Sequence, residues 1–176
     1  MREIRWGLED NLAVSIYAKE CFDYDQMEEI KIGLKEGIDV YQYARSELDY
    51  IQMGEIRLGL MNRLDVSIYA KTEFNNQQMY EIRKGLQDNL DISVYATTKF
   101  DGFQMEEIRE GLEDNLDILI YVKSGFSEYQ LKEIRLGLKY NLEVSKYAKP
   151  DYKWERMEQI RKSLMKENTR YLLNNR

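Results

Sequence analysis

The residues of this chain that could do chemistry recur every 26 positions. One row is basic and holds the same place in each unit: Arg5, Lys31, Arg57, Arg83, Arg109, Arg135 and Arg161. Regularly spaced cations are suited to the phosphates of a nucleic-acid strand. An equally regular acidic row runs beside them: Glu3, Glu29, Glu55, Glu81, Glu107 and Glu133. Because Glu28, Glu106 and Glu158 also lie three residues before a basic residue, we expect salt-bridged neutralisation, with phosphate binding as the alternative.

A tyrosine series follows the same period, at Tyr17, Tyr43, Tyr69, Tyr95, Tyr121 and Tyr147. Such a ladder of aromatic rings could stack the bases of a single strand. A core position is the simpler interpretation, because tyrosine fills space between helices while its hydroxyl finds a partner at the edge. We therefore expect these rings to be buried.

A glycine series lies inside the predicted long helices, at Gly7, Gly33, Gly59, Gly85, Gly111 and Gly137. Glycine costs about 1 kcal/mol against alanine in a helix interior, so its repetition needs a reason. We expect neighbouring long helices to approach closely at this point, and a ligand approaching the backbone is the alternative.

Few residues are suited to catalysis. The chain has no histidine, which removes the commonest general base and zinc ligand, and Cys21 is its one cysteine. The glycines form no phosphate-binding loop, and the adjacent carboxylates Glu28 and Glu29 point to different sides of a helix. We expect a protein that is not an enzyme and needs no cofactor or metal.

The positions of these residues are set by a repeat without insertions or deletions. Isoleucine recurs at Ile4, Ile30, Ile56, Ile82, Ile108, Ile134 and Ile160, and leucine follows four residues later in each unit. A short fixed period indicates stacked units that cannot bury their apolar face alone. The fold prediction is all-α: an α-solenoid of 26-residue two-helix repeats forming one domain over 1–176. Six full repeats start near 3, 29, 55, 81, 107 and 133, and a capping unit spans 159–176.

Each unit carries the signals of a long helix followed by a short one. Asp23 can cap the helix start, and Gln26 three residues later can reach back. Gly37, or asparagine at the equivalent places 11, 89, 115 and 141, can end the helix in a left-handed conformation. An aspartate such as Asp65 then precedes Val66 to Ala70, which we expect to form the second, shorter helix.

Composition narrows the classes of partner. The net charge of −6 opposes general attraction to nucleic acid or anionic membranes, and the longest apolar run, 118–122, is too short to cross a bilayer. With one cysteine and no apolar leader, we expect a cytoplasmic protein. Met1 lies in the first turn of a predicted long helix, so the first unit has an open face through which the chain could form a homodimer.

Specific function should lie where the units differ, since the shared positions serve folding. The variable places of the long helix are those equivalent to 25, 28, 32 and 35, which lie on one outward face. In the early units this face is apolar, and we predict a partner-binding surface there, formed by Trp6, Ile32, Ile51, Leu58, Met61 and Tyr80. Coverage of the face by the short helices or by a second copy is the alternative.

The string from Gln104 to Leu112, followed by 115–118, resembles a short helical repeat in proteins of gut bacteria and their mobile elements. The resemblance covers nearly the whole chain and brings no catalytic or binding residues. It implies a small acidic protein that binds and blocks a host protein, such as a nucleic-acid-guided defence complex.

We therefore expect a non-catalytic protein-binding scaffold, in its specific form a phage or mobile-element inhibitor that docks a host protein complex. One alternative is a modular single-stranded nucleic-acid binder using the arginine and tyrosine ladders. Another is an acidic nucleic-acid mimic that occupies a basic groove of its target.

Overall fold

The structure, a computed structural model, describes residues 2–122 and 125–174. In these residues every regular element is helical and no strand occurs, which confirms the all-α prediction. The chain forms two compact units, Met1–Asn89 and Leu90–Arg176. The single domain over 1–176 and its capping unit stay predictions.

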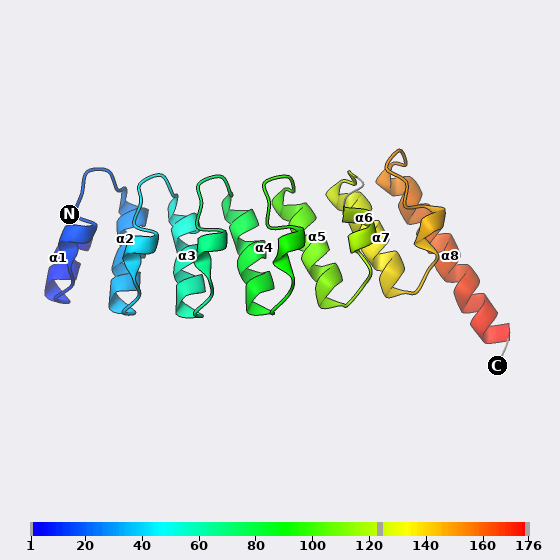
Figure 1. Cartoon of the computed structure of the whole chain (residues 1–176), viewed down its shortest axis with the longest axis horizontal. Helices are drawn as coiled ribbons and strands as arrows, with labels where there is room; N and C mark the ends of the chain where they lie inside the picture. Colours follow the sequence, from blue (N-terminus) through cyan, green and yellow to red (C-terminus); the bar gives the residue numbers. More distant parts are fainter. Residues whose placement is uncertain (1, 123–124, 175–176) are drawn as a thin grey trace. The chain divides into compact units, whose positions relative to one another are not determined.

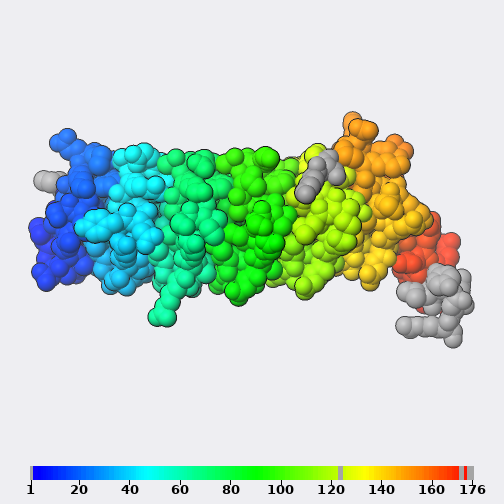
Figure 2. All heavy atoms as spheres, in the orientation of Figure 1, coloured from blue at the N-terminus to red at the C-terminus, as the bar shows by residue number. Residues whose placement is uncertain are grey.

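The first unit contains four long helices, α1 (Arg2–Glu9), α2 (Tyr24–Lys35), α3 (Tyr50–Met61) and α4 (Asn76–Gln87). Three short 3₁₀ helices alternate with them, η1 (Val14–Ile16), η2 (Val40–Gln42) and η3 (Val66–Ile68). Consecutive long helices pack side by side, and each 3₁₀ helix lies against the long helix before it (Figure 1). In the space-filling view the repeats of this unit form successive bands (Figure 2).

The second unit repeats the plan with one change. It contains η4 (Ile92–Val94), α5 (Gly102–Glu113), α6 (Leu119–Val122), α7 (Glu128–Lys139), η5 (Val144–Lys146) and α8 (Trp154–Asn174). Here α5 packs on α7 and α7 packs on α8 (Figure 1). No helix in the described residues is long and apolar enough to span a membrane.

The predicted helix starts are confirmed. Asp23 accepts a hydrogen bond from the Gln26 amide, and the Gln26 side chain accepts one from the Asp23 amide, both at 2.9 Å. The same reciprocal box starts α3, α4, α5 and α7. The Gln26 side chain also donates to the carbonyl oxygen of Leu48, 2.6 Å away at the end of the next loop. One residue type thus starts its own helix and holds the following repeat.

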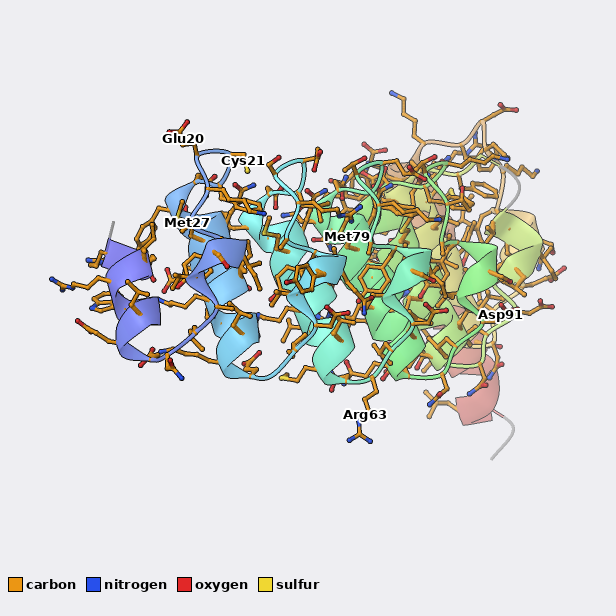
Figure 3. The ribbon with its side chains drawn as sticks, turned by 60° about the vertical axis from the view of Figure 1, so that its left-hand side comes forward. Glu20, Cys21, Met27, Arg63, Met79 and Asp91 are labelled. Atoms are coloured by element: carbon orange, nitrogen blue, oxygen red, sulfur yellow. The ribbon has the colours of Figure 1, made fainter. Side chains whose placement is uncertain are left out.

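The predicted helix ends are confirmed too. Gly37 and the asparagines at 11, 89, 115 and 141 have φ between 52° and 71°. Arg63 takes the same conformation, with φ 59°, although it has a long side chain at a position that favours glycine or asparagine. In Figure 3 Arg63 stands away from the ribbon just beyond α3, at the opposite end of the repeats from the loop that carries Glu20 and Cys21.

The short second helix is tighter than expected. Asp65 accepts a hydrogen bond from the Ser67 amide at 3.1 Å, and the Tyr69 amide donates to the Val66 carbonyl at 3.0 Å. This i to i+3 pattern closes a single 3₁₀ turn of three residues. The 3₁₀ turns η1 and η5 form without a side-chain cap, so the cap supports this turn where aspartate is present and is not required for it.

The glycine series is explained by tyrosine, and the expectation of closely approaching long helices was wrong. A Cβ atom added at Gly33 would lie 1.8 Å from the hydroxyl of Tyr43 and 3.0 Å from Cγ1 of Val40, both in the same repeat. The Tyr43 hydroxyl donates to the Glu29 carbonyl at 3.2 Å. Gly7, Gly59 and Gly137 face Tyr17, Tyr69 and Tyr147 in the same way. The missing Cβ therefore makes room for a buried tyrosine.

One repeat departs from this arrangement. Residues 119–122 form the α-helical turn α6, with Leu119 where most repeats have serine and Val122 where they have alanine. Ile118 occupies the space in front of Gly111, 3.0 Å from the point where a Cβ would lie, and Tyr121 lies edge-on to Phe126 instead. The prediction of a buried tyrosine is therefore confirmed at 17, 43, 69, 95 and 147, and Tyr121 is only half-buried.

Candidate protein-interaction surface

The basic and acidic rows meet between neighbouring long helices. In the first unit Lys31 pairs with Glu3, Arg57 with Glu29 at 2.9 Å and Arg83 with Glu55 at 2.6 Å. In the second unit Arg135 pairs with Glu107 at 2.7 Å and Arg161 with Glu133 at 2.6 Å. Each cation thus bonds to the carboxylate 28 residues before it, on the preceding long helix.

We expected salt bridges to neutralise the basic row, and these ion pairs confirm it. The carboxylates, however, come from the preceding long helix and not from the position three residues earlier on the same helix. Glu158 bonds to Lys162 at 2.7 Å, while Arg161 turns to Glu133. Arg109 is also buried and bonds to Glu113 at 3.0 Å. Arg5 is the exposed member of the row, 3.6 Å from Glu9. Phosphate binding by the buried members would require breaking ion pairs inside the stack.

The environment of the acidic row changes along the chain. Burial raises the pKa of Glu107, and the hydrogen bond from Arg135 offsets this only in part. Burial acts in the same direction at Glu3, but hydrogen bonds from Lys31 and Tyr24 outweigh it and leave the pKa lowered. Burial also raises the pKa of Tyr43, Tyr69 and Tyr147, so these hydroxyls stay protonated donors.

The tyrosine ladder contributes no exposed ring to a stacking surface at the five regular positions, which have no accessible area. Their hydroxyls are used as well: Tyr17, Tyr69 and Tyr147 donate to backbone carbonyls 14 residues earlier at 3.0–3.2 Å. Base stacking by these rings would need the repeats to open.

The six residues predicted to bind a partner differ in exposure. Ile51, Met61 and Tyr80 are exposed, while Trp6, Ile32 and Leu58 are half-buried. Trp6 is covered by cations, with Arg2 at 4.7 Å and Lys31 at 5.0 Å from its ring centroid. Three of the six therefore offer a large free apolar surface.

On α3 the apolar residues form a stripe. Ile51, Gly54, Leu58 and Met61 follow one another at i, i+3, i+7 and i+10, which places them on one face. The two ends of this stripe are the exposed side chains, Ile51 at 40 % and Met61 at 50 %. Glu55 and Arg57 are the only charged residues of α3, and both are committed to ion pairs of the ladder. We call Ile51, Gly54, Leu58 and Met61 the α3 stripe.

Two features of the surface are not among the residues predicted from the sequence. Gly54 was not singled out, although it stands where other repeats have Glu28, Tyr80 or Glu106, and a comparison of repeats could have found it. A second apolar group in the other unit, Phe103, Tyr129 and Trp154, lies at the starts of α5, α7 and α8 with all three rings exposed. The rings of Tyr129 and Trp154 lie 5.5 Å apart.

The charge of the chain is unevenly distributed. Residues 1–89 carry 11 lysines and arginines against 17 aspartates and glutamates, whereas residues 90–176 carry 15 of each. The whole net charge of −6 therefore belongs to the first unit, which also carries the α3 stripe.

Other kinds of site find little support in the described residues. No group of three or more histidine, cysteine, aspartate or glutamate side chains among them could hold a metal ion. Glu106 and Glu107 both line a hollow of about 260 Å³ with Phe103 and Tyr129, but Glu107 is held by Arg135.

Comparison with protein-family models, with curated proteins and with solved structures gives no match for this chain.

Proposed function

We propose that this chain is a non-catalytic protein-binding scaffold that engages its partner through the outward face of its first unit. The observation that carries the proposal is the α3 stripe, which exposes Ile51 and Met61 on a helix without free charge. Exposed apolar side chains on a helix face are typical anchors of protein interfaces. The residues common to the repeats support this assignment, because their side chains already make contacts within and between repeats and are not free to bind a partner.

In its specific form the proposal is an inhibitor, phage-borne or carried by a mobile element, that docks a host protein complex. Support for this form comes from the resemblance of the repeat to proteins of gut bacteria and their mobile elements. No catalytic step is required, because occupying a surface of the target is sufficient to block it. The expected setting is the cytoplasm of a bacterial host.

The test is capture of a partner from a bacterial lysate by the tagged chain, with and without nuclease. We expect a defined protein complex that survives nuclease and is lost with the double variant Ile51→Glu and Met61→Glu. The matched control is Tyr41→Glu with Phe103→Glu, which adds the same charge at more exposed apolar positions elsewhere. Equal capture by the two double variants would exclude the α3 stripe as the binding surface.

A second candidate is the acidic mimic of nucleic acid, and the charge distribution favours it. The first unit carries the entire net charge, so a basic groove could accept it. The two candidates differ in salt dependence. Between about 50 and 500 mM salt, affinity through apolar anchors with a few flanking charges weakens only modestly, whereas binding of the whole acidic unit to a basic groove weakens steeply.

A further inference from the structure

The α3 stripe differs from the corresponding face of every other long helix that the structure describes. At the equivalent positions α2 carries Asp25, Glu28 and Lys35, and α4 carries Lys84. The other long helices have at least one charged residue there as well. A helix that is apolar on its outward side as well as toward the core is typical of one covered on both sides.

Gly54 has no reason to be glycine within the chain. A Cβ added there would have the Glu29 carboxylate as its nearest neighbour, with Oε2 at 3.6 Å and Cδ at 3.7 Å, which is ordinary van der Waals contact. At Gly33 the corresponding distance to the Tyr43 hydroxyl is 1.8 Å. Gly54 therefore weakens α3 without serving the packing of its own repeat.

Gly54 leaves a stretch of backbone without a side chain on the outward face of α3. Gly54 is equivalent to Glu28 on α2 and to Tyr80 on α4, the helices that pack on either side of α3. Large side chains thus stand on both sides of a bare stretch of backbone, with Ile51 and Leu58 one turn before and after it. A glycine in such a place allows another backbone to approach closely.

The two helices that pack beside α3 differ in charge on this face. On the α2 side Asp25 and Glu28 have no hydrogen-bond or ion-pair partner in the described residues, whereas Glu29 is paired with Arg57. On the α4 side Tyr80 presents an aromatic ring, with Arg83 5.4 Å from its centroid. A complementary occupant is apolar along its centre and basic along the edge that faces α2.

We propose that the α3 stripe binds an amphipathic helix of a partner protein, with an apolar seam against Ile51, Leu58 and Met61, closest approach at Gly54 and lysine or arginine facing Asp25 and Glu28. This names the partner class for the proposed scaffold and rests on that function. In this mode of recognition an amphipathic helix packs its apolar side against an apolar face, where anchors at helical spacing give affinity and flanking charges give orientation.

The first experiment separates a role in binding from a role in folding. Because ordinary contact surrounds the Cβ site, Gly54→Ala should raise the urea midpoint of unfolding, and Gly54→Leu should leave the helical circular dichroism unchanged. A fall in the midpoint with Gly54→Ala would show that glycine is required by the fold and would overturn the proposal.

The second experiment uses fluorescein-labelled peptides of about 20 residues and the full chain, with anisotropy as the readout. The probe is a helix with leucine along one face and lysine along one flank; the controls are the same peptide with glutamate for lysine and a scrambled peptide of identical composition. We expect the leucine and lysine helix to bind at least tenfold more tightly than either control. Gly54→Leu and the pair Asp25→Lys with Glu28→Lys should each weaken that binding at least tenfold, whereas Phe103→Glu should not.

Equal binding of the scrambled peptide, or unchanged binding by Gly54→Leu, would overturn the inference. A concentration-dependent dimer that dissociates on Gly54→Leu would also overturn it, by making a second copy the occupant. The scaffold proposal can fail or hold independently of the helix inference. If capture from lysate is lost with Ile51→Glu and Met61→Glu but kept with Gly54→Leu, the α3 stripe binds a partner, but not a helix that approaches Gly54 closely. If both variants capture normally, the two proposals fail together.

Discussion

The contact between glycine and tyrosine within a repeat allows a quantitative prediction, for the substitution Gly33→Ala. The new Cβ would lie 1.8 Å from the Tyr43 hydroxyl, so the hydroxyl would have to move by about 1.5 Å to reach normal contact. That movement would break its 3.2 Å hydrogen bond to the Glu29 carbonyl, in a position with no accessible surface.

The expected free-energy change combines three effects. Loss of the hydrogen bond costs about 1 kcal/mol, and crowding of a packed core costs about 2 kcal/mol. Alanine stabilises the helix interior by about 1 kcal/mol relative to glycine. Gly33→Ala should therefore lower the free energy of unfolding by about 2 kcal/mol, and Tyr43→Phe should lower it by about 1 kcal/mol through the hydrogen bond alone.

In the double variant the hydroxyl is gone, and the nearest atoms to the new Cβ are Cγ1 of Val40 at 3.0 Å and the ring carbon Cζ at 3.1 Å. Small shifts relieve such contacts, so the double variant should be about as stable as Tyr43→Phe. Urea unfolding of the four proteins, followed by circular dichroism, should then give a coupling energy of about 2 kcal/mol. A coupling near zero would refute the explanation of the glycine series. Gly54→Ala, where no clash exists, should be more stable than the wild type in the same assay.

Three further predictions concern single positions. Arg63→Asn should raise the free energy of unfolding by about 0.5–1 kcal/mol, because asparagine tolerates the left-handed φ of 59° better than arginine; an unchanged urea midpoint would contradict this. Arg135→Ala should lower it by about 3 kcal/mol, because Glu107 stays buried without its cation, and Glu107→Gln should cost much less in the same measurement. The folded-state pKa of Glu107 is raised, so the folded chain binds this proton more tightly than the unfolded chain and loses stability as pH rises from the ordinary glutamate pKa through the raised one. Urea midpoints between about pH 4 and 7 should therefore show Glu107→Gln gaining on the wild type as pH rises, and a falling difference would reverse the sign of the argument.

The local structure follows from the sequence because its causes are local. Asp23 and Gln26 are three residues apart, which is the distance of the reciprocal box that starts a helix. Gly37 and Asn89 are residue types that accept positive φ, and they do so where the helices end. The 26-residue period adds the stacking of one repeat on the next. None of these inferences requires knowledge of how far apart two helices lie.

The partners across helices do not follow from the sequence in the same way. Arg161 has Glu158 one turn away on its own helix, yet it bonds to Glu133, 28 residues earlier. The pair on the same helix would stay in water, where it contributes little, whereas Glu133 is buried beside the arginine. Likewise a glycine and a tyrosine ten residues apart, such as Gly33 and Tyr43, meet only because the chain reverses between them. The period shows that such contacts repeat, and it leaves open which residues make them.

The candidate surface was predictable in its position and only partly in its residues. The outward places of the long helix are the variable ones, and Ile51, Met61 and Tyr80 are exposed there. Trp6 is held between two cations, Lys31 of the basic row and Arg2 at the variable place equivalent to Gly54. A comparison of the repeats marks Gly54 as unusual, but only the surrounding distances show that no contact within the chain requires glycine there.

The repeat offers an internal standard for separating folding from function. Gly33 and Gly54 are both glycines inside a long helix, and the same helix propensity acts against each. At Gly33 the structure supplies the compensating gain, a buried tyrosine with its hydrogen bond. At Gly54 the structure supplies no such gain. Gly54 lies among the apolar side chains of the α3 stripe, and among the described long helices only α3 has no charged residue on this outward face. A residue that opposes helix formation without improving packing inside the chain indicates a requirement set by something outside the chain. A partner helix that packs closely against α3 would set such a requirement.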